Sequence, residues 1–498
     1  MNGIEAPSAW EVFRLVGRCG HVAFATLLLA AAVVGAAAAA RPAATAPRPT
    51  HGVVVGDVTA RHAVLWTRTS EPATLRIHLE GGPHARVLPA RTTAARDLTA
   101  QVALRRLRPG TTYRYRIFLG GSRTVATRGT FRTAPRRDTA APVRLAFGGD
   151  VGGQNVCRDA RDGFPIAQTI RAWRPDVFVG LGDMIYADDV CTATGRYGNA
   201  QVPSGLGRAA DLADFFGHWR YTRADAALQR LLASTNYVGI WDDHEIVNDS
   251  GPLTAGPLLP LALQAFLAYT PISIASETPN RIYRRLRYGR NLELFVLDTR
   301  QYRDANFAVD DPRAPKTMLG REQLTWLKAR LAASDAVWKV VVSSVPMSIP
   351  TGFPPTNGRD GWANFDQQTG YEHELVDLLR FLERQDVRNL VFLTTDVHFA
   401  SGFRYTPFAE SPAFRVHELV TGPMNAGIFP NPSFDTTLRP ERLFLYAPPS
   451  ADAVTSWEEA KRWFNFGALA IARDGTLTAQ VVNTAGEAVA TLPLSPAR

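Results

Sequence analysis

The sequence predicts an α/β fold in which a layered domain follows a smaller all-β domain. Two observations support this division. From Val143 onward, short apolar runs alternate with helical stretches, which is typical of strands whose sheet is covered by helices. Between residues 51 and 135, apolar and polar residues instead alternate one by one between turn signals, as in half-buried strands. A chain of 498 residues is long enough for both domains and a sizeable core.

Residues 1–40 have the pattern of an export signal. Arg14 and Arg18 precede an apolar segment from His21 to Ala40 that ends in small residues, an order typical of secretory signals. Because about 20 apolar residues can span a bilayer, an uncleaved membrane anchor is the alternative. With either interpretation the protein is expected to be secreted, periplasmic or in the cell envelope. Residues 41–50, rich in Ala, Pro and Thr, are expected to form a linker.

Residues 51–135 are predicted to form a β-sandwich. The stretch "LRPGTTYRYRI", from Leu107 to Ile117, resembles the corner of a fibronectin-III-like domain, with Tyr113 as the corner tyrosine. The range contains no cluster of acidic residues or histidines, so we assign it no chemistry. The stretch 135–142, "PRRDTAAP", is expected to be the boundary to the second domain.

Residues 143–498 supply the elements of the layered domain. Strands are predicted at 143–150, 175–183, 236–245, 292–300, 337–347 and 388–398. Helices are predicted at 164–173, 223–233, 321–333 and 371–385. The last stretch, 466–496, has the Asp-Gly and Ala-Gly turns of β-hairpins and is expected to complete a sheet.

Charge and cysteine content narrow the class of protein. The net charge is +9, but basic residues are dispersed in runs no longer than two, so no specific nucleic-acid binding is expected. The charge is compatible with anionic substrates or envelope polymers. Cys157 and Cys191 are the two cysteines outside the export segment. In an oxidising compartment a disulfide between them and two free thiols are both open possibilities.

Acidic residues and histidines lie at the ends of five of the predicted strands. They are Asp150, Asp183, Asp242, Asp243, His244, Asp298, Asp396 and His398. Ligands of open α/β sheets bind beyond the carboxyl ends of the strands, so these side chains are expected to meet there. Each motif alone could be a turn or a helix start, but together the acids would repel one another unless cations were bound. Carboxylate and imidazole ligands suit Ca, Mn, Fe or Zn, so the sequence predicts a metal site.

Five motifs together resemble the PhoD-like alkaline phosphatase/phosphodiesterase family of the metallophosphoesterase superfamily. They are "GDMIYADD", "WDDHEIVND", "LDTRQYRD", "TTDVHFASG" and "HELVTGPMNAG". The resemblance covers nearly the whole chain. It implies a four-layer α/β/β/α sandwich over residues 143–498, a fibronectin-III-like domain over 51–135, and a centre of two or three metals. The expected activity is that of a metal-dependent phosphoric ester hydrolase.

The resemblance also implies ligands for a ferric ion. Asp183 would bridge the metals, Tyr186 would supply a phenolate, and His398 would complete the first site. The family's best-known pattern has a cysteine, within Ser-Cys-Gln, at the first strand end. Here "FGGDVGGQ" resembles a subgroup with aspartate, so Asp150 would replace the thiolate.

The remaining residues are expected to serve a second metal and the substrate. Asp243 and Asp396 would hold the second metal, with Asp242 and Asn248 as outer or additional calcium ligands. His244 resembles the histidine that contacts the substrate phosphate. Arg300 and Arg303 would contact phosphate or pair with the acids. Fe(III) and Ca(II) are the expected metals, with Zn or Mn as alternatives. Segments 306–320 and 350–367 are expected to border the site.

The function expected from the sequence is exported hydrolysis of phosphate monoesters, diesters or both by a metal-activated hydroxide. His244, Asp183 and Arg300 would be the catalytic residues, the substrate a small molecule or an envelope polymer, and no stable partner protein is expected. One alternative is a purple-acid-phosphatase-like phytase, which would show Asn-His and His-x-His where this chain has "DDHE" and "DVH". The other is a non-catalytic calcium-binding envelope protein.

Overall fold

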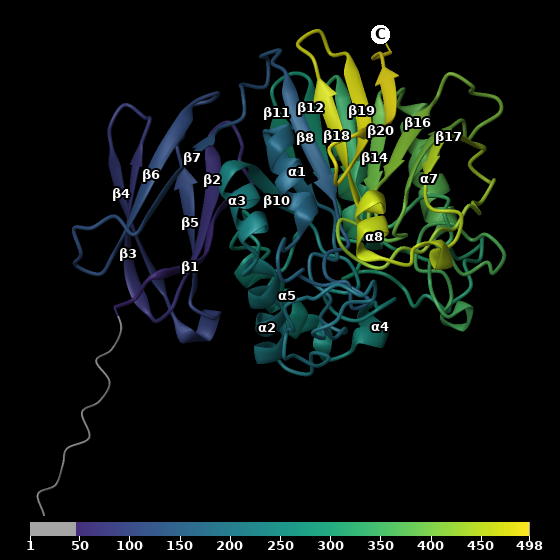
Figure 1. Cartoon of the computed structure of the whole chain (residues 1–498). Coiled ribbons are helices and arrows are strands. Elements are labelled where there is room, and N and C mark those ends of the chain that lie inside the picture. Colours follow the sequence, from purple (N-terminus) through teal and green to yellow (C-terminus); the bar gives the residue numbers. More distant parts are fainter. Residues whose placement is uncertain (1–45, 498) are drawn as a thin grey trace, which may run out of the picture. The chain divides into compact units, whose positions relative to one another are not determined.

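The computed structural model describes residues 46–497, and within them two large sheets pack face to face with helices outside (Figure 1). The layers follow the order α/β/β/α, and an all-β region precedes them in the chain. This confirms the fold class predicted from the sequence. Within the described range no helix is both long and apolar enough to cross a bilayer, and the predicted export segment lies outside that range.

The first sheet has nine strands, and its neighbours β8, β9, β10 and β1 run parallel. In spatial order the strands are β20 (Ala488–Leu494), β19 (Leu477–Asn483), β18 (Asn465–Ile471), β8 (Val143–Gly148), β9 (Val177–Gly180), β10 (Asn236–Gly239), β1 (Pro49–Gly56), β2 (His62–Thr69) and β5 (Thr99–Arg105). The C-terminal strands β18, β19 and β20 pair antiparallel, as the hairpin turns predicted.

The second sheet has seven strands, with β12, β13, β14 and β16 parallel. In spatial order they are β11 (Arg284–Tyr288), β12 (Leu292–Val296), β13 (Trp338–Val342), β14 (Leu390–Thr394), β16 (Val416–Val420), β15 (Ala400–Tyr405) and β17 (Pro440–Tyr446). The carboxyl ends of the two parallel sets lie at one common edge. Thr395 after β14 hydrogen-bonds across to Asp150 after β8, with 2.6 Å between the oxygens.

Apolar side chains on alternating faces of the strands hold the layers together. In β13, Val340 and Val342 pack between the sheets, whereas Val341 packs beneath the helices of the outer layer. Because both faces of such a strand are buried, its sequence is an unbroken apolar run. The helices over the nine-stranded sheet are α1 (Pro165–Trp173), α2 (Leu212–Arg223), α3 (Ala226–Ser234) and α5 (Leu258–Tyr269). Those over the seven-stranded sheet are α6 (Gly320–Ala332) and α7 (Glu372–Arg384). Two short helices, α4 (Pro252–Ala255) and α8 (Trp457–Trp463), lie in connections.

The N-terminal region is a small sandwich that shares a sheet with the layered domain. A four-stranded sheet of β4 (Arg86–Thr92), β3 (Ala73–Glu80), β6 (Thr112–Leu119) and β7 (Thr127–Arg132) packs on β1, β2 and β5 around its own apolar core. However, β1 also pairs with β10, through Val55 with Asn236 and Gly56 with Tyr237. Gly56 also packs closely against Pro271. A Cβ atom at position 56 would lie 2.5 Å from Pro271, so this contact requires glycine. The division at 135–142 drawn from sequence patterns did not anticipate this shared sheet.

Tyr113 forms the predicted tyrosine corner, since its hydroxyl accepts a hydrogen bond from the Arg108 N–H at 2.8 Å. Tyr113→Phe removes the acceptor and leaves this N–H unpaired. We expect the free energy of unfolding to fall by about 1–2 kcal/mol. Denaturant unfolding measures the change, with Tyr302→Phe as the control because Tyr302 is partly exposed and its hydroxyl forms no hydrogen bond within residues 46–497. Equal stability of the two variants would contradict the assigned role.

Candidate metal centre

Four of the residues that follow strands hold an unusual backbone conformation. Asp150, Asp183, Asp396 and His398 have φ angles of 61°, 51°, 77° and 60°. Non-glycine residues seldom adopt this left-handed conformation, which costs about 1–3 kcal/mol at each position. Strain of this kind persists where the surrounding structure fixes it, and it concentrates at functional sites.

Four carboxylates meet at the common edge of the sheets. Asp183, Asp242, Asp243 and Asp396 each place an oxygen within 4.8 Å of the others. The first three are buried, and Asp396 is partly buried. Each of the four keeps one buried oxygen without a hydrogen-bond partner, as does neighbouring Asp150. Buried polar atoms are normally satisfied, so five such oxygens in one place are suited to binding a cation.

The electrostatics of these acids lead to the same conclusion. Burial raises the pKa of Asp150 to about 7, against the hydrogen bond from Thr395. Burial likewise raises the pKa of Asp242 to about 7, although Arg300 opposes the shift. Burial and the neighbouring carboxylates raise the pKa of Asp183 and of Asp396 well above the usual range. The ionised cluster is therefore costly by itself, and bound cations would relieve that cost.

Tyr186 and His398 add a phenol and an imidazole beside Asp150. The Tyr186 hydroxyl lies 3.1 Å from His398 Nε2, and Asp150 Oδ1 lies 3.7 Å from the same nitrogen. His398 Nδ1 is 2.5 Å from the Gly427 carbonyl, to which it can only donate, so in the neutral ring Nε2 is the acceptor and faces the Tyr186 hydroxyl. Burial lowers the pKa of His398 to about 4, which keeps the ring neutral. Oxygen and imidazole donors together fit iron, zinc or manganese, so the residues present suit the expected metals.

Glu245 fixes the backbone on which the ligands stand. Its carboxylate accepts hydrogen bonds from the N–H groups of Asp183, Met184 and Asp242 at 2.9, 2.8 and 2.7 Å. These bonds join the segment after β9 to the segment after β10. Glu245 therefore positions two candidate ligands, a role that the sequence analysis did not assign to it.

Arg300 pairs with acids, which is one of the two roles expected for it. Its side chain is fully buried. It forms a two-pronged pair with Asp360 at 2.7 and 2.6 Å and donates from Nε to Asp242 Oδ1 at 2.5 Å. Arg303 joins the same network through Asp360 at 2.6 Å. With its donors taken up by carboxylates and the Ser250 carbonyl, Arg300 is better described as a positioning residue than as the predicted catalytic contact with phosphate.

His244 lies at the cluster with one ring nitrogen available. Its Nδ1 is 2.8 Å from Asp188 Oδ1, and its ring packs 4.1 Å, centroid to centroid, from that of Tyr186. Burial lowers the pKa of His244, but Asp188 and Asp243 outweigh it and raise the pKa to about 10. Among the described residues none hydrogen-bonds to Nε2. His244 thus places a ring nitrogen without a hydrogen-bond partner beside Asp183 and Asp243.

Asn248 is not brought into the four-carboxylate cluster. It is exposed, and its side-chain amide donates to the Phe353 carbonyl at 3.4 Å. Its neighbour Asp249 also lies outside that cluster, but it forms a second acidic group with Asp243 and Asp360. Asp249 is therefore a further candidate ligand, which the sequence analysis did not name.

Cys157 and Cys191 form a disulfide, which settles the alternative that the sequence left open. Their Cα atoms are 5.8 Å apart. The bond joins the segment that follows Asp150 to the segment that follows Tyr186. It therefore connects the loops that carry two of the candidate ligands.

Other residues at the site were not assigned a role from the sequence. Asp188 and Asp249 lie in quoted motifs and follow Asp183 and Asp243 by five and six positions, so proximity was a usable signal. Asp360 lies in segment 350–367, and Asn306, which donates to it at 2.8 Å, lies in segment 306–320. Both segments were expected to border the site, but no local pattern singled out these two residues.

Comparison with known proteins identifies the family of the chain. Residues 147–460 match the PhoD-like phosphatase family, and residues 35–135 match the N-terminal domain of PhoD-like phosphatases. The chain is 27% identical over 394 residues to alkaline phosphatase D of Bacillus subtilis (strain 168), which covers 70% of this chain and 64% of that protein. The chain thus spans a little under two thirds of the length of this curated relative.

Two solved structures share the fold. The structure of PhoD has a TM-score of 0.69 at 21% identity and covers 92% of this chain and 94% of its own. Purple acid phosphatase PPD1 from yellow lupin (Lupinus luteus) seeds has a TM-score of 0.58 at 14% identity, over 90% of this chain and 74% of its own. The family match extends over well more than half of the sequence and includes every candidate ligand. The chain therefore belongs to the PhoD-like phosphatase family.

Proposed function

We propose that this protein is an exported, metal-dependent phosphoesterase. The observation that carries the proposal is the cluster of four carboxylates with unpartnered oxygens, placed beside Tyr186, His398 and the free donor of His244. Export is supported by the predicted N-terminal signal and by the Cys157–Cys191 disulfide, a bond typical of oxidising compartments. The family relationship supports a phosphate ester as the substrate.

The donor sets favour two kinds of metal. Asp150, Asp183, Tyr186 and His398 would hold Fe(III), because a phenolate is a good ligand for this hard cation. Asp183, Asp242, Asp243 and Asp396 offer only carboxylate oxygens, the ligands that Ca(II) prefers. Zn or Mn are the alternatives. When bound, such cations neutralise charge on the phosphoryl oxygens and lower the pKa of water toward 7.

The side chains of the protein supply binding and proton transfer. In the reaction, water attacks phosphorus, the P–O bond of the ester breaks, and the leaving alcohol takes up a proton. His244 Nε2–H would donate to a phosphoryl oxygen or to that leaving oxygen, and Asp188 would hold the ring in orientation. Arg300 would keep Asp242 in place without touching the substrate.

Aromatic side chains border the metal centre and suit an organic leaving group. The Phe429 ring lies 5.2 Å, centroid to centroid, from that of His398, and the Arg196 guanidinium lies 5.2 Å from the Phe429 centroid. Phe353 is 77% exposed, and its N–H donates to Asp249 at 2.8 Å. Monoesters and diesters are both candidate substrates, on small molecules or on an envelope polymer.

Tyr186→Phe tests the iron assignment. The variant keeps the ring but loses the only phenol oxygen near Asp150 and His398 among the described residues. We expect the metal-loaded protein to show a tyrosinate-to-iron absorption band in the visible range and the variant to lose it. Tyr221→Phe is the matched control, because the Tyr221 hydroxyl bonds to the Val202 carbonyl away from the acids. A colourless protein that is active with zinc or manganese would contradict iron while leaving the phosphoesterase proposal intact.

The function itself is tested by hydrolysis of a chromogenic phosphate monoester and a chromogenic diester. We expect the purified protein to release the chromophore from at least one of them, and the ratio of the two kcat/KM values assigns the ester class. A protein with full metal content that hydrolyses neither ester would contradict the proposal and favour the non-catalytic calcium-binding alternative.

A further inference from the structure

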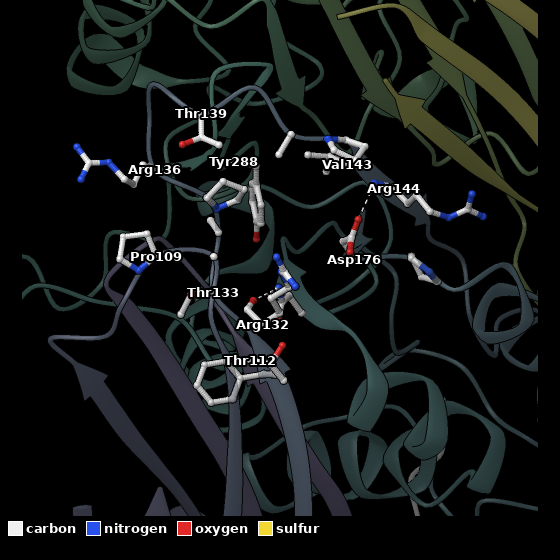
Figure 2. Close-up of a pocket in the computed structure, with 18 of the residues that line it drawn as sticks. Pro109, Thr112, Arg132, Thr133, Arg136, Thr139, Val143, Arg144, Asp176 and Tyr288 are labelled. Carbon is white, nitrogen blue, oxygen red and sulfur yellow. Dashed lines mark hydrogen bonds between the residues drawn. The ribbon is translucent and has the colours of Figure 1, made fainter. Parts of the chain in front are cut away.

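A second candidate site lies at the amino ends of the parallel strands in the nine-stranded sheet, whereas the metal centre lies at their carboxyl ends. A cavity of about 920 Å³ is lined by the end of β7, by the connection 133–142 and by the amino ends of β8, β9 and β10 (Figure 2). We call it the junction cavity, because the N-terminal sandwich forms one wall and the layered domain the other. Its volume is in the range of small-molecule sites, which occur preferentially between domains.

Tyr288, at the end of β11, presents an unsatisfied hydroxyl to the junction cavity. The residue is 3% exposed, and its buried hydroxyl has no hydrogen-bond partner. Figure 2 shows the hydroxyl end of the ring directed toward Arg132 and Thr133 rather than into the sheet. Burial raises the pKa of Tyr288 well above the usual range, so the hydroxyl is a neutral donor. A buried hydroxyl without a partner carries a desolvation cost that a ligand oxygen would remove.

The charged residues that line the cavity indicate that its ligand is an anion. Arg61, Arg132 and Arg473 line the junction cavity, and within residues 46–497 their guanidinium groups form no ion pair or hydrogen bond. Asp176 is the one carboxylate among the lining residues, and it accepts a hydrogen bond from the Arg144 N–H at 2.9 Å. Unpaired guanidinium groups with planar arrays of donors are suited to carboxylate and phosphate oxygens.

Two further arginines of the lining already have partners. The Arg144 guanidinium lies 3.9 Å from the centroid of the Trp173 ring, and Arg136 pairs with Asp138 at 3.4 Å. Figure 2 shows both side chains directed away from Tyr288. Arg136 therefore provides a matched control, since it is an arginine of the same rim that is already paired.

We propose that the junction cavity binds the oxyanion of a small molecule, held by the Tyr288 hydroxyl and the guanidinium groups of Arg61, Arg132 and Arg473. The lining includes no histidine, cysteine or acidic cluster, so we assign the cavity a binding role alone. Its ligand is a phosphate or carboxylate group, either free or carried on an organic body that fits the cavity.

Calorimetric titration of the metal-loaded protein with inorganic phosphate tests the proposal. The expected result is two classes of site, one at the metal centre and one in the junction cavity. The variant Arg132→Ala/Arg473→Ala should lose the second class and keep the first, whereas Arg136→Ala should keep both. Tyr288→Phe should weaken the second class about tenfold or more, the loss typical of a hydrogen bond to a charged group.

A parallel titration with phenylphosphonate separates the two sources of the oxyanion, because its C–P bond is not a phosphate ester. Tighter binding of phenylphosphonate to the second class assigns an organic ligand, and tighter binding of phosphate assigns the free ion. Selenate soaked into crystals and located by anomalous scattering should lie within hydrogen-bond distance of the Tyr288 hydroxyl. Phosphate binding that is unchanged in Arg132→Ala/Arg473→Ala, whether it shows one class of site or two, would overturn the proposal. Failure of ester hydrolysis would not affect this test.

Discussion

Asp183→Asn is expected to abolish ester hydrolysis. Asp183 belongs both to the four-carboxylate cluster and to the group that it forms with Asp243 and His244. Its Oδ1 accepts a hydrogen bond from the backbone N–H of His244 at 3.2 Å, and its Oδ2 has no hydrogen-bond partner. In the variant, the amide oxygen of asparagine can still accept the hydrogen bond from His244. Its NH₂ group then faces the acids in place of Oδ2, the candidate metal ligand. The loss should exceed the roughly hundred- to thousand-fold loss that follows removal of one electrostatic donor.

The measurement is kcat/KM for a chromogenic ester, together with the metal content of the same sample. Asp138→Asn is the control, since this carboxylate is exposed in the connection between the domains and pairs with exposed Arg136. Because Asp183→Asn also removes one charge from a self-repelling cluster, the metal-free variant should be at least as stable as the metal-free wild type. Full activity with reduced metal content would contradict the role assigned to Asp183.

Asp360→Asn is expected to cause the largest loss of stability. The carboxylate of Asp360 accepts hydrogen bonds from Arg300, Arg303 and Asn306, and all four residues are buried. Removing one partner of a buried ion pair leaves an uncompensated charge, which costs about 3–5 kcal/mol. Denaturant unfolding of the metal-loaded proteins measures the change. Activity should also fall, because Arg300 positions Asp242.

The effect of this substitution should depend on pH. Burial acts to raise the pKa of Asp360, but Arg300 and Arg303 outweigh it and hold the pKa far below the usual range. A lowered pKa contributes stability above the unfolded value, about 4 for aspartate, and that contribution is lost only as the pH falls below it. The difference between wild type and Asp360→Asn should therefore be full at neutral pH and shrink in strong acid.

Glu441→Gln provides the comparison for Asp360→Asn, because Glu441 pairs with Arg404 at an exposed position. Exposed pairs contribute about 0–1 kcal/mol, so this substitution should have little effect. An equally small change in Asp360→Asn would show that the buried network does not hold the site together.

Sequence patterns predicted the elements whose environment is simple. β13 and β14 are buried on both faces and appear as unbroken apolar runs, and α1 and α7 have one apolar stripe facing a sheet. In contrast, α2 and α5 were not predicted. α2 contains Gly217 and mixes aromatic with polar residues, while α5 is apolar on most sides and has Pro260 in its first turn. These helices are stabilised by the core over the nine-stranded sheet more than by their own periodicity.

The same distinction applies to the metal centre. Asp150, Asp183, Asp243 and Asp396 could be predicted because each follows a strand, and parallel strands end at one edge. Asp360 could not, because the path of the 350–367 loop brings it to Arg300, 60 residues earlier in the chain. For the same reason the sequence could not choose between the two roles of Arg300. The β1–β10 pairing depends on two residue pairs across separate sequence regions and leaves no local signal.

Ester hydrolysis during removal and return of metal tests the central claim most directly. Wild-type protein is treated with a chelator, its metal content is measured, and iron and calcium are then added back in steps. If the acidic cluster holds the catalytic metals, the rate will fall to background as metal is lost and will return in proportion to the metal rebound. A protein shown to be metal-free that still hydrolyses the ester at the original rate would contradict the account.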